Sequence, residues 1–205
     1  MNARIKAGQS CGKPVYLEHF NLARSPFRLT PAIDCFFQGA ERAELLHALT
    51  YALVHGDGIT MLTGEVGTGK TTLSRVLMSQ ASSQLQFIYV ANPALSAIEL
   101  QLALAHELRL TRARRGPELI GRIQRALIAL HASGRQVVML VDEAHEMPVA
   151  TLQQIRLLTN LETSAQKLLQ VLLVGQPELK MLLAMRALRP LRDRIANNLE
   201  VKPLG

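Results

Sequence analysis

The chain has 205 residues, enough for one large domain or for one domain with an appendage. Hydrophobic residues make up 48% of it, aromatic residues only 4%, and tryptophan is absent, so an aliphatic globular core is expected. The net charge of +7 permits nucleic acid or an anionic membrane surface as a partner, although a nucleotide-binding protein also needs positive charge for its own ligand.

Two cysteines, Cys11 and Cys35, are the only ones in the sequence. They have neither the spacing of metal ligands nor that of a disulfide framework, which indicates reduced thiols in a cytoplasmic protein. The first residues are basic but lack an apolar segment, so no signal peptide is expected. No apolar run reaches the length of a membrane span.

Strands and helices alternate along the predicted chain. Residues 1–14 lack an apolar pattern and are expected to form a flexible arm, whereas residues 15–205 are expected to form one folded domain. Hydrophobic periodicity predicts strands at residues 59–62, 85–90, 137–141, 168–174 and 199–202. Helices are predicted at residues 41–54, 73–77, 96–110, from 117, from 148 and at 179–185. This alternation predicts an α/β fold, a five-stranded parallel sheet with helices on both faces.

A glycine-rich segment between the first strand and the next helix fully matches the pattern G-x-x-x-x-G-K-[ST]. Its residues are Gly64, Glu65, Val66, Gly67, Thr68, Gly69, Lys70, Thr71 and Thr72. The glycines allow the backbone to turn its N–H groups toward a polyphosphate, and the helix N-terminus adds partial positive charge. Lys70 is expected to contact the β- and γ-phosphates of ATP, and Thr71 to bind Mg²⁺.

A second motif, Asp142-Glu143, ends the apolar strand at residues 137–141. At the carboxyl end of a buried strand both acids are expected beside the phosphate loop, with Asp142 holding Mg²⁺ and Glu143 activating the attacking water. One strand separates the two motifs along the chain, which predicts an extra strand inserted between them. With Ala144 and His145 the acids also spell the box of a helicase class, but 205 residues cannot hold the two tandem domains that such helicases need.

Six segments together resemble one family, the AAA+ ATPases of the general secretion pathway protein A and MSHA pilus biogenesis M type. Besides the phosphate loop and the Asp-Glu-Ala-His box, they are residues 16–20, 25–31, 156–162 and 174–179, and the resemblance covers residues 15–204. It implies a P-loop NTPase of the AAA+ class with ATP and Mg²⁺ as cofactors. It also implies a homo-oligomer with shared nucleotide sites. The helical lid that usually follows the fifth strand is expected to be absent.

The resemblance also assigns roles by position. Gln176 occupies the position at which the family has a polar sensor of the γ-phosphate. An equally good explanation of this glutamine is a structural role at the start of a helix. Three arginines, Arg189, Arg192 and Arg194, are candidates for the arginine that reaches a neighbouring subunit's nucleotide, and Arg194 matches the family pattern best. A solvated basic helix face explains these arginines equally well. Pro26 and Phe27 are either part of an adenine pocket or part of the core.

Three functions are compatible with these motifs. The first is an Mg²⁺-dependent ATPase that supports secretion or pilus assembly with partner proteins, in the cytoplasm or recruited to the inner membrane. The second is a DNA-bound transposition regulator, in which residues 109–115 and the net positive charge would bind DNA phosphates. No base-reading motif is evident for this function. The third is a module that binds nucleotide and scarcely hydrolyses it.

Overall fold

A computed structural model describes residues 15–21, 36–37, 39, 41–56, 58–81, 84–110, 116, 118–163 and 166–203. The chain divides into two units, Met1–Cys35 and Phe36–Gly205. In the first unit the described structure is the short helix α1, Val15–His19, and the turn that follows it. The predicted arm, both cysteines, Pro26, Phe27 and most of the basic connection at 109–115 lie outside the described residues.

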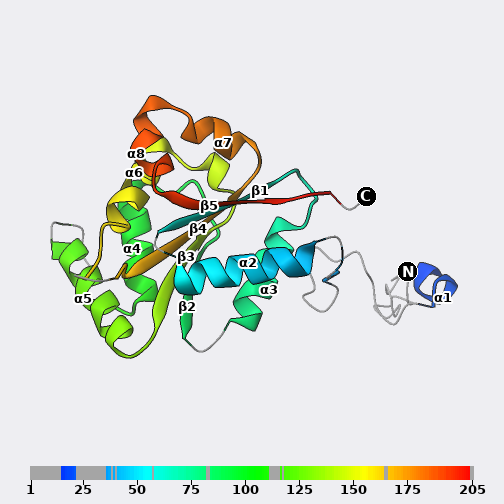
Figure 1. Ribbon diagram of the computed structural model, residues 1–205, viewed down its shortest axis with the longest axis horizontal. Helices are drawn as coiled ribbons and strands as arrows, with labels where there is room; N and C mark the ends of the chain where they lie inside the picture. Colours follow the sequence, from blue (N-terminus) through cyan, green and yellow to red (C-terminus); the bar gives the residue numbers. More distant parts are fainter. Residues whose placement is uncertain are drawn as a thin grey trace, which may run out of the picture. The chain divides into compact units, whose positions relative to one another are not determined.

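The second unit is built on a five-stranded sheet in which every neighbouring pair of strands is parallel, as predicted (Figure 1). The strands, in chain order, are β1 (Ile59–Gly64), β2 (Leu85–Val90), β3 (Gln136–Val141), β4 (Leu169–Gly175) and β5 (Ile195–Val201). Their order across the sheet is β2-β3-β4-β1-β5. Parallel pairing places the carboxyl ends of all five strands at the same edge, where the two predicted motifs follow β1 and β3.

The strand inserted between the two motif-bearing strands is β4, which pairs with β1 on one side and β3 on the other. The prediction of an inserted strand is therefore confirmed. However, the strand that separates the motifs along the chain, β2, lies at the edge of the sheet beyond β3. Chain order alone could not distinguish these arrangements, because both strands read as short apolar runs.

Helices cover both faces of the sheet, which completes the predicted three-layer fold (Figure 1). On one face are α2 (Arg42–His55) and α3 (Lys70–Gln80). On the other face are α4 (Ala97–Glu107), α5 (Glu118–Ala132), α6 (Val149–Leu158), α7 (Glu178–Leu183) and α8 (Arg189–Arg192). Two short 3₁₀ turns, Ala144–Glu146 and Arg186–Leu188, follow β3 and α7.

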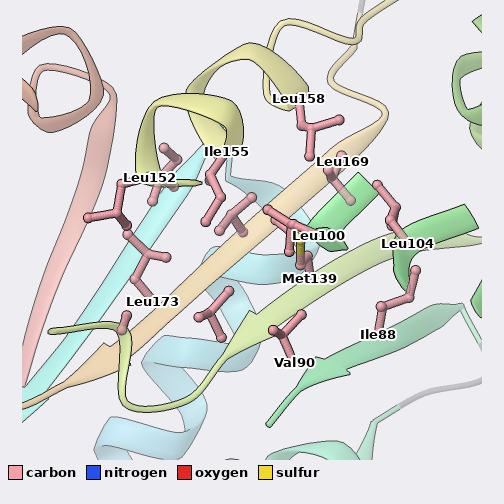
Figure 2. Packing of buried hydrophobic residues seen from close by; sticks show 14 of the residues in the cluster. Ile88, Val90, Leu100, Leu104, Met139, Leu152, Ile155, Leu158, Leu169 and Leu173 are labelled. Atoms are coloured by element: carbon pink, nitrogen blue, oxygen red, sulfur yellow. The ribbon is translucent and has the colours of Figure 1, made fainter. Parts of the chain in front are cut away.

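Alternate residues of each central strand belong to different halves of the core. On β3, Met139 packs toward α4, α5 and α6, whereas Val138 and Leu140 pack toward α2 and α3. Figure 2 shows the first of these clusters, in which Leu100 and Leu104 of α4 meet side chains from the sheet and from α6. Because both faces are covered, these strands carry apolar residues toward both faces rather than alternating regularly with polar residues.

Several element ends differ from the sequence prediction. The capping box of Ser96 and Glu99 is present, with Glu99 N–H donating to the Ser96 hydroxyl, but α4 ends at Glu107 rather than near residue 110. The last strand begins at Ile195 rather than at Leu199, four residues earlier than predicted. It is an edge strand whose residues alternate between half-buried and exposed, so its first half carries polar residues that hide a strand pattern.

A buried glutamine, Gln170, lies within the apolar strand β4 and is only 5% exposed. Its side-chain amide donates to the carbonyl of Gly56 and accepts a hydrogen bond from the N–H of Gly58, at 3.0 Å. These bonds tie the segment between α2 and β1 to the centre of the sheet. They satisfy backbone groups where the chain enters the strand that leads to the phosphate loop.

Candidate functional site

The glycine-rich loop connects the carboxyl end of β1 to the first turn of α3, which begins at Lys70. Gly64 packs directly against the end of β5: a Cβ atom there would lie 2.7 Å from the Val201 carbonyl oxygen and 2.9 Å from Thr68 Oγ1. Gly69, the N-cap residue of α3, has φ of 87°, a left-handed conformation that glycine adopts at no steric cost. The first glycine is therefore required by a close approach and the last by backbone conformation.

The side chain of Lys70 lies inside this loop and is only 6% exposed. Its ammonium group donates to the carbonyl oxygens of Gly64, at 2.8 Å, and Glu65, at 3.0 Å. Thr68 donates its hydroxyl to the same Glu65 carbonyl, at 2.8 Å. The loop is thus held closed around a positive charge at the N-terminus of α3, a geometry suited to an anion.

The two motifs meet at a hydrogen bond between α3 and the end of β3. Thr71 Oγ1 donates to Asp142 Oδ2 at 3.0 Å, and Asp142 is 5% exposed. The other carboxylate oxygen, Oδ1, accepts the backbone N–H of Glu143 at 3.0 Å. A hydroxyl and a carboxylate are hard oxygen ligands of the kind that Mg²⁺ prefers, so this pair fits a magnesium ion shared with phosphate oxygens.

Tyr89, on the edge strand β2, is a third member of this cluster that the sequence analysis did not identify. Its phenol donates to Asp142 Oδ2 at 3.0 Å, the same oxygen that accepts from Thr71. Burial is the larger cause and the negative charge of Asp142 the next, and together they raise the pKa of Tyr89 to about 12. The positive charge of Arg75 opposes this rise. Tyr89 therefore stays protonated, and able to donate, throughout the neutral pH range.

Glu143 has a backbone conformation that is unusual for a residue with a side chain. Its φ of 50° places it in the left-handed region, at the start of the turn that follows β3. Its Oε2 atom is buried and accepts no hydrogen bond within the described part of the chain. Strained backbone and an unsatisfied carboxylate oxygen are both typical of functional positions.

His145 lies between Glu143 and the residue after β4. Its Nδ1 atom lies 3.4 Å from Glu143 Oε2 and accepts the backbone N–H of Gln176, also at 3.4 Å. Gln176 is half-buried at the carboxyl edge, directly before Pro177, the N-cap residue of α7, and its backbone carbonyl accepts the N–H of Leu179 at 2.9 Å.

Arg194 lies at the opposite edge of the sheet from the other predicted site residues. It precedes β5, whose first residue pairs with Ile59 at the start of β1, and its guanidinium donates to Thr159 Oγ1 at 3.3 Å. The length of these strands separates it from the phosphate loop of the same chain by about 20 Å. The other two candidates, Arg189 and Arg192, are exposed and form ion pairs with Asp193 at 3.8 and 3.7 Å.

The site therefore combines predicted residues with two that the prediction missed. Lys70, Thr71, Asp142, Glu143 and Gln176 gather at the carboxyl edge of the sheet, whereas Arg194 does not. Tyr89 could have been found as a polar residue near the end of a strand adjacent to β3. The second, Arg42 on α2, donates to the carbonyl of Thr68, and nothing in the sequence pattern marks it.

None of the helices in the described residues is both long and apolar enough to cross a membrane.

Sequence comparison relates this arrangement to known proteins. The sequence profile of the AAA domain family matches residues 52–183, which include the phosphate loop and the Asp142-Glu143 motif. General secretion pathway protein A of Aeromonas hydrophila is 41% identical over 193 residues, which cover 93% of this chain. The chain spans about a third, 35%, of the length of that relative.

Solved structures with the same fold include the ORC1 protein of Aeropyrum pernix in complex with DNA, with a TM-score of 0.60. The two sequences are 18% identical, and the match covers 86% of this chain and 48% of the ORC1 chain. Cdc6p of Pyrobaculum aerophilum has the same TM-score and coverage at 17% identity. The Aeropyrum pernix ORC2 protein in ADPNP-ADP complexes gives a TM-score of 0.54 and 19% identity, over 80% of this chain and 47% of that one. At these identities the likeness concerns the fold. The chain belongs to the AAA domain family, within which it resembles general secretion pathway protein A.

Proposed function

We propose that this domain binds ATP with Mg²⁺ and hydrolyses it. The observation that carries the proposal is the 3.0 Å hydrogen bond between Thr71 and Asp142, which joins the phosphate loop to the acidic end of β3. This contact supports the proposal because it joins a residue that we assign to the phosphate loop with a residue that we assign to the metal. The buried ammonium of Lys70 supports the same assignment, because it lies at the centre of the loop.

Each residue then has a distinct role. The loop N–H groups and Lys70 hold the β- and γ-phosphates, and Thr71 and Asp142 hold Mg²⁺, which when bound offsets negative charge on the phosphates. Glu143 accepts a proton from the attacking water, a role that its Oε2 atom supports because it accepts no hydrogen bond within the described residues. Gln176, next to His145, orients the water or senses the γ-phosphate from the end of β4.

The active assembly in this proposal is a homo-oligomer. Arg194 is about 20 Å from its own phosphate loop, given the length of the intervening strands, so it serves the nucleotide of a neighbouring subunit. Such an arginine stabilises the charge that develops on the transferred phosphoryl group. The exposed position of Arg194 beside Thr159 leaves it accessible to a second copy of the chain.

The cellular role that we propose is support of general secretion or of MSHA-type pilus assembly from the cytoplasmic face of the inner membrane, through partner proteins. The 41% identity with general secretion pathway protein A supports it. In a secretion-deficient strain lacking this gene, wild type should restore export, whereas Glu143→Gln should not. Equal restoration by both would contradict a role for hydrolysis in the pathway.

Phosphate release tests the biochemical proposal directly. Wild type should release phosphate from ATP with Mg²⁺ and stop when EDTA is added, and Lys70→Ala should neither bind nor hydrolyse ATP. Binding of ATP by wild type without measurable turnover at any protein concentration would instead favour the nucleotide-binding module.

The DNA-binding alternative rests on the net charge of +7 and the basic connection at residues 109–115. It predicts binding that weakens steeply with rising salt, because cationic side chains displace counterions from phosphates. Fluorescence anisotropy with a duplex oligonucleotide at several salt concentrations tests it. An absence of binding even at low salt would remove this alternative.

A further inference from the structure

Arg42, the first residue of α2, is a buried cation in direct contact with the phosphate loop. It is 5% exposed, and its Nη1 atom donates to the carbonyl oxygen of Thr68 at 2.7 Å. A Cβ atom built on Gly69 would lie 3.4 Å from the same nitrogen. The guanidinium therefore lies against the loop at the peptide that joins Thr68 to Gly69.

The described residues do not neutralise this buried charge. Within the described ranges no aspartate or glutamate forms an ion pair with Arg42, and its hydrogen-bond acceptor is a neutral carbonyl. It also lies at the N-terminus of α2 and close to that of α3, where the helix dipoles already present positive charge. An anion in the loop would offset all of these costs together.

The contact also fixes the direction of one backbone donor. The Thr68–Gly69 peptide is trans, so its carbonyl and its N–H point in opposite directions. When the Thr68 carbonyl faces Arg42, the Gly69 N–H faces away from the guanidinium. In a loop that curls around a bound phosphate, the direction of each such N–H decides whether it can donate to the ligand.

We propose that Arg42 is a positioning residue of the phosphate loop, one that orients the Thr68–Gly69 peptide and adds a second positive charge beside Lys70 for polyphosphate. This inference rests on the proposed nucleotide-binding function. Arg42 acts through the loop on the phosphate part of the ligand, so both ATP and inorganic tripolyphosphate should depend on it. The affinity for each should therefore fall together when Arg42 is changed.

The test compares Arg42→Gln, Arg42→Lys and wild type by calorimetric titration with Mg-ATP and, separately, with tripolyphosphate. Hydrogen bonds to charged groups are among the strong ones, so Arg42→Gln should lower the affinity for both ligands about 10- to 100-fold. The affinity of Arg42→Lys should lie between those of Arg42→Gln and wild type. Arg125→Gln is the matched control: Arg125 also donates to a backbone carbonyl, that of Gly121, but on the exposed surface of α5. It should bind both ligands as wild type does.

A readout without ligand separates positioning from a general structural role. In ligand-free protein, hydrogen exchange in the phosphate-loop peptide should be faster in Arg42→Gln, while the melting temperature stays within a few degrees of wild type. Unchanged affinity for both ligands in Arg42→Gln would overturn the inference, as would a large loss of melting temperature with unchanged affinity of the folded protein. If wild type binds neither ligand, the proposed function is wrong, and this inference falls with it.

Discussion

Thr71 and Asp142 are 71 positions apart in the sequence, yet their side-chain oxygens lie 3.0 Å apart. The contact exists because β1 and β3 are parallel strands of one sheet, separated by β4, whose carboxyl ends meet at a single edge. It turns two separate motifs into one candidate site. Under the proposed function, it is also where a metal ion would join the chain to a bound nucleotide.

Tyr89 should tune the affinity for Mg²⁺, because it donates to the same Asp142 oxygen as Thr71. Loss of an outer-shell hydrogen bond to a metal ligand costs about 10- to 100-fold in metal affinity or activity. Tyr89→Phe should therefore raise the Mg²⁺ concentration for half-maximal hydrolysis by about tenfold, at saturating ATP. Tyr51→Phe, at an exposed position on α2, is the control. Identical Mg²⁺ titrations for Tyr89→Phe and wild type would exclude a role for the phenol.

Gly64→Ala should damage both stability and ligand binding, since its new methyl group would lie 2.7 Å from the Val201 carbonyl oxygen. Overpacking of this kind costs about 1–3 kcal/mol of unfolding free energy.

The control variant Gly121→Ala, within α5, should act in the opposite direction. Its Cβ atom would meet nothing within 4 Å, and alanine stabilises a helix by about 1 kcal/mol relative to glycine. Urea denaturation measures both changes. A Gly64→Ala protein as stable as wild type would contradict the close packing of loop and β5.

Gln170 should contribute to stability through its two backbone partners. Gln170→Leu keeps an apolar side chain in β4 but leaves the Gly58 N–H and the Gly56 carbonyl unpaired, at a cost of about 1–3 kcal/mol. Gln153→Leu removes one hydrogen bond to the Ala187 carbonyl from an exposed glutamine, so it should cost about 0.5 kcal/mol or less. Equal stability losses for the two variants, again by urea denaturation, would contradict this role for Gln170.

The fold was largely predictable because its strongest signals are local. Each buried strand is a mostly apolar segment of six or seven residues, and the Ser96–Glu99 capping box marks the start of α4. The order of the strands was not predictable, because pairing of β1 with β4 is a long-range choice that short apolar runs do not encode. The start of β5 was missed because an edge strand retains polar residues such as Asn197 and Asn198.

The distinction between local sequence signals and long-range contacts also applies to the residues of the candidate site. The residues at motif positions, such as Lys70 and Asp142, were predictable because phosphate and Mg²⁺ require particular groups at fixed spacings. Tyr89 has only a weak signal, a polar residue near the end of a strand, and Arg42 has none, since each reaches the site from an element that has no motif of its own. Their roles depend on tertiary contacts, which only the folded arrangement brings together.

Arg194 should act between subunits rather than within one. We expect the specific activity of wild type to rise with protein concentration, as subunits associate and each arginine reaches a neighbour's nucleotide. Such an arginine can contribute about 10³-fold or more in rate. Arg194→Ala should abolish the rise and leave ATP affinity nearly unchanged, whereas Arg125→Ala should preserve the rise. Activity per subunit that stays constant in a protein shown to be monomeric throughout would reject the shared site.

The most direct measurement compares ATP binding and ATP turnover in wild type and Glu143→Gln. Glutamine keeps the shape of the side chain but cannot accept the proton from water, so it should remove the chemical step and leave ground-state binding intact. The account predicts that Glu143→Gln binds Mg-ATP as tightly as wild type and shows no hydrolysis in a single-turnover assay. Hydrolysis by Glu143→Gln at the wild-type rate would contradict the assignment of Glu143 and, with it, the proposed catalytic site.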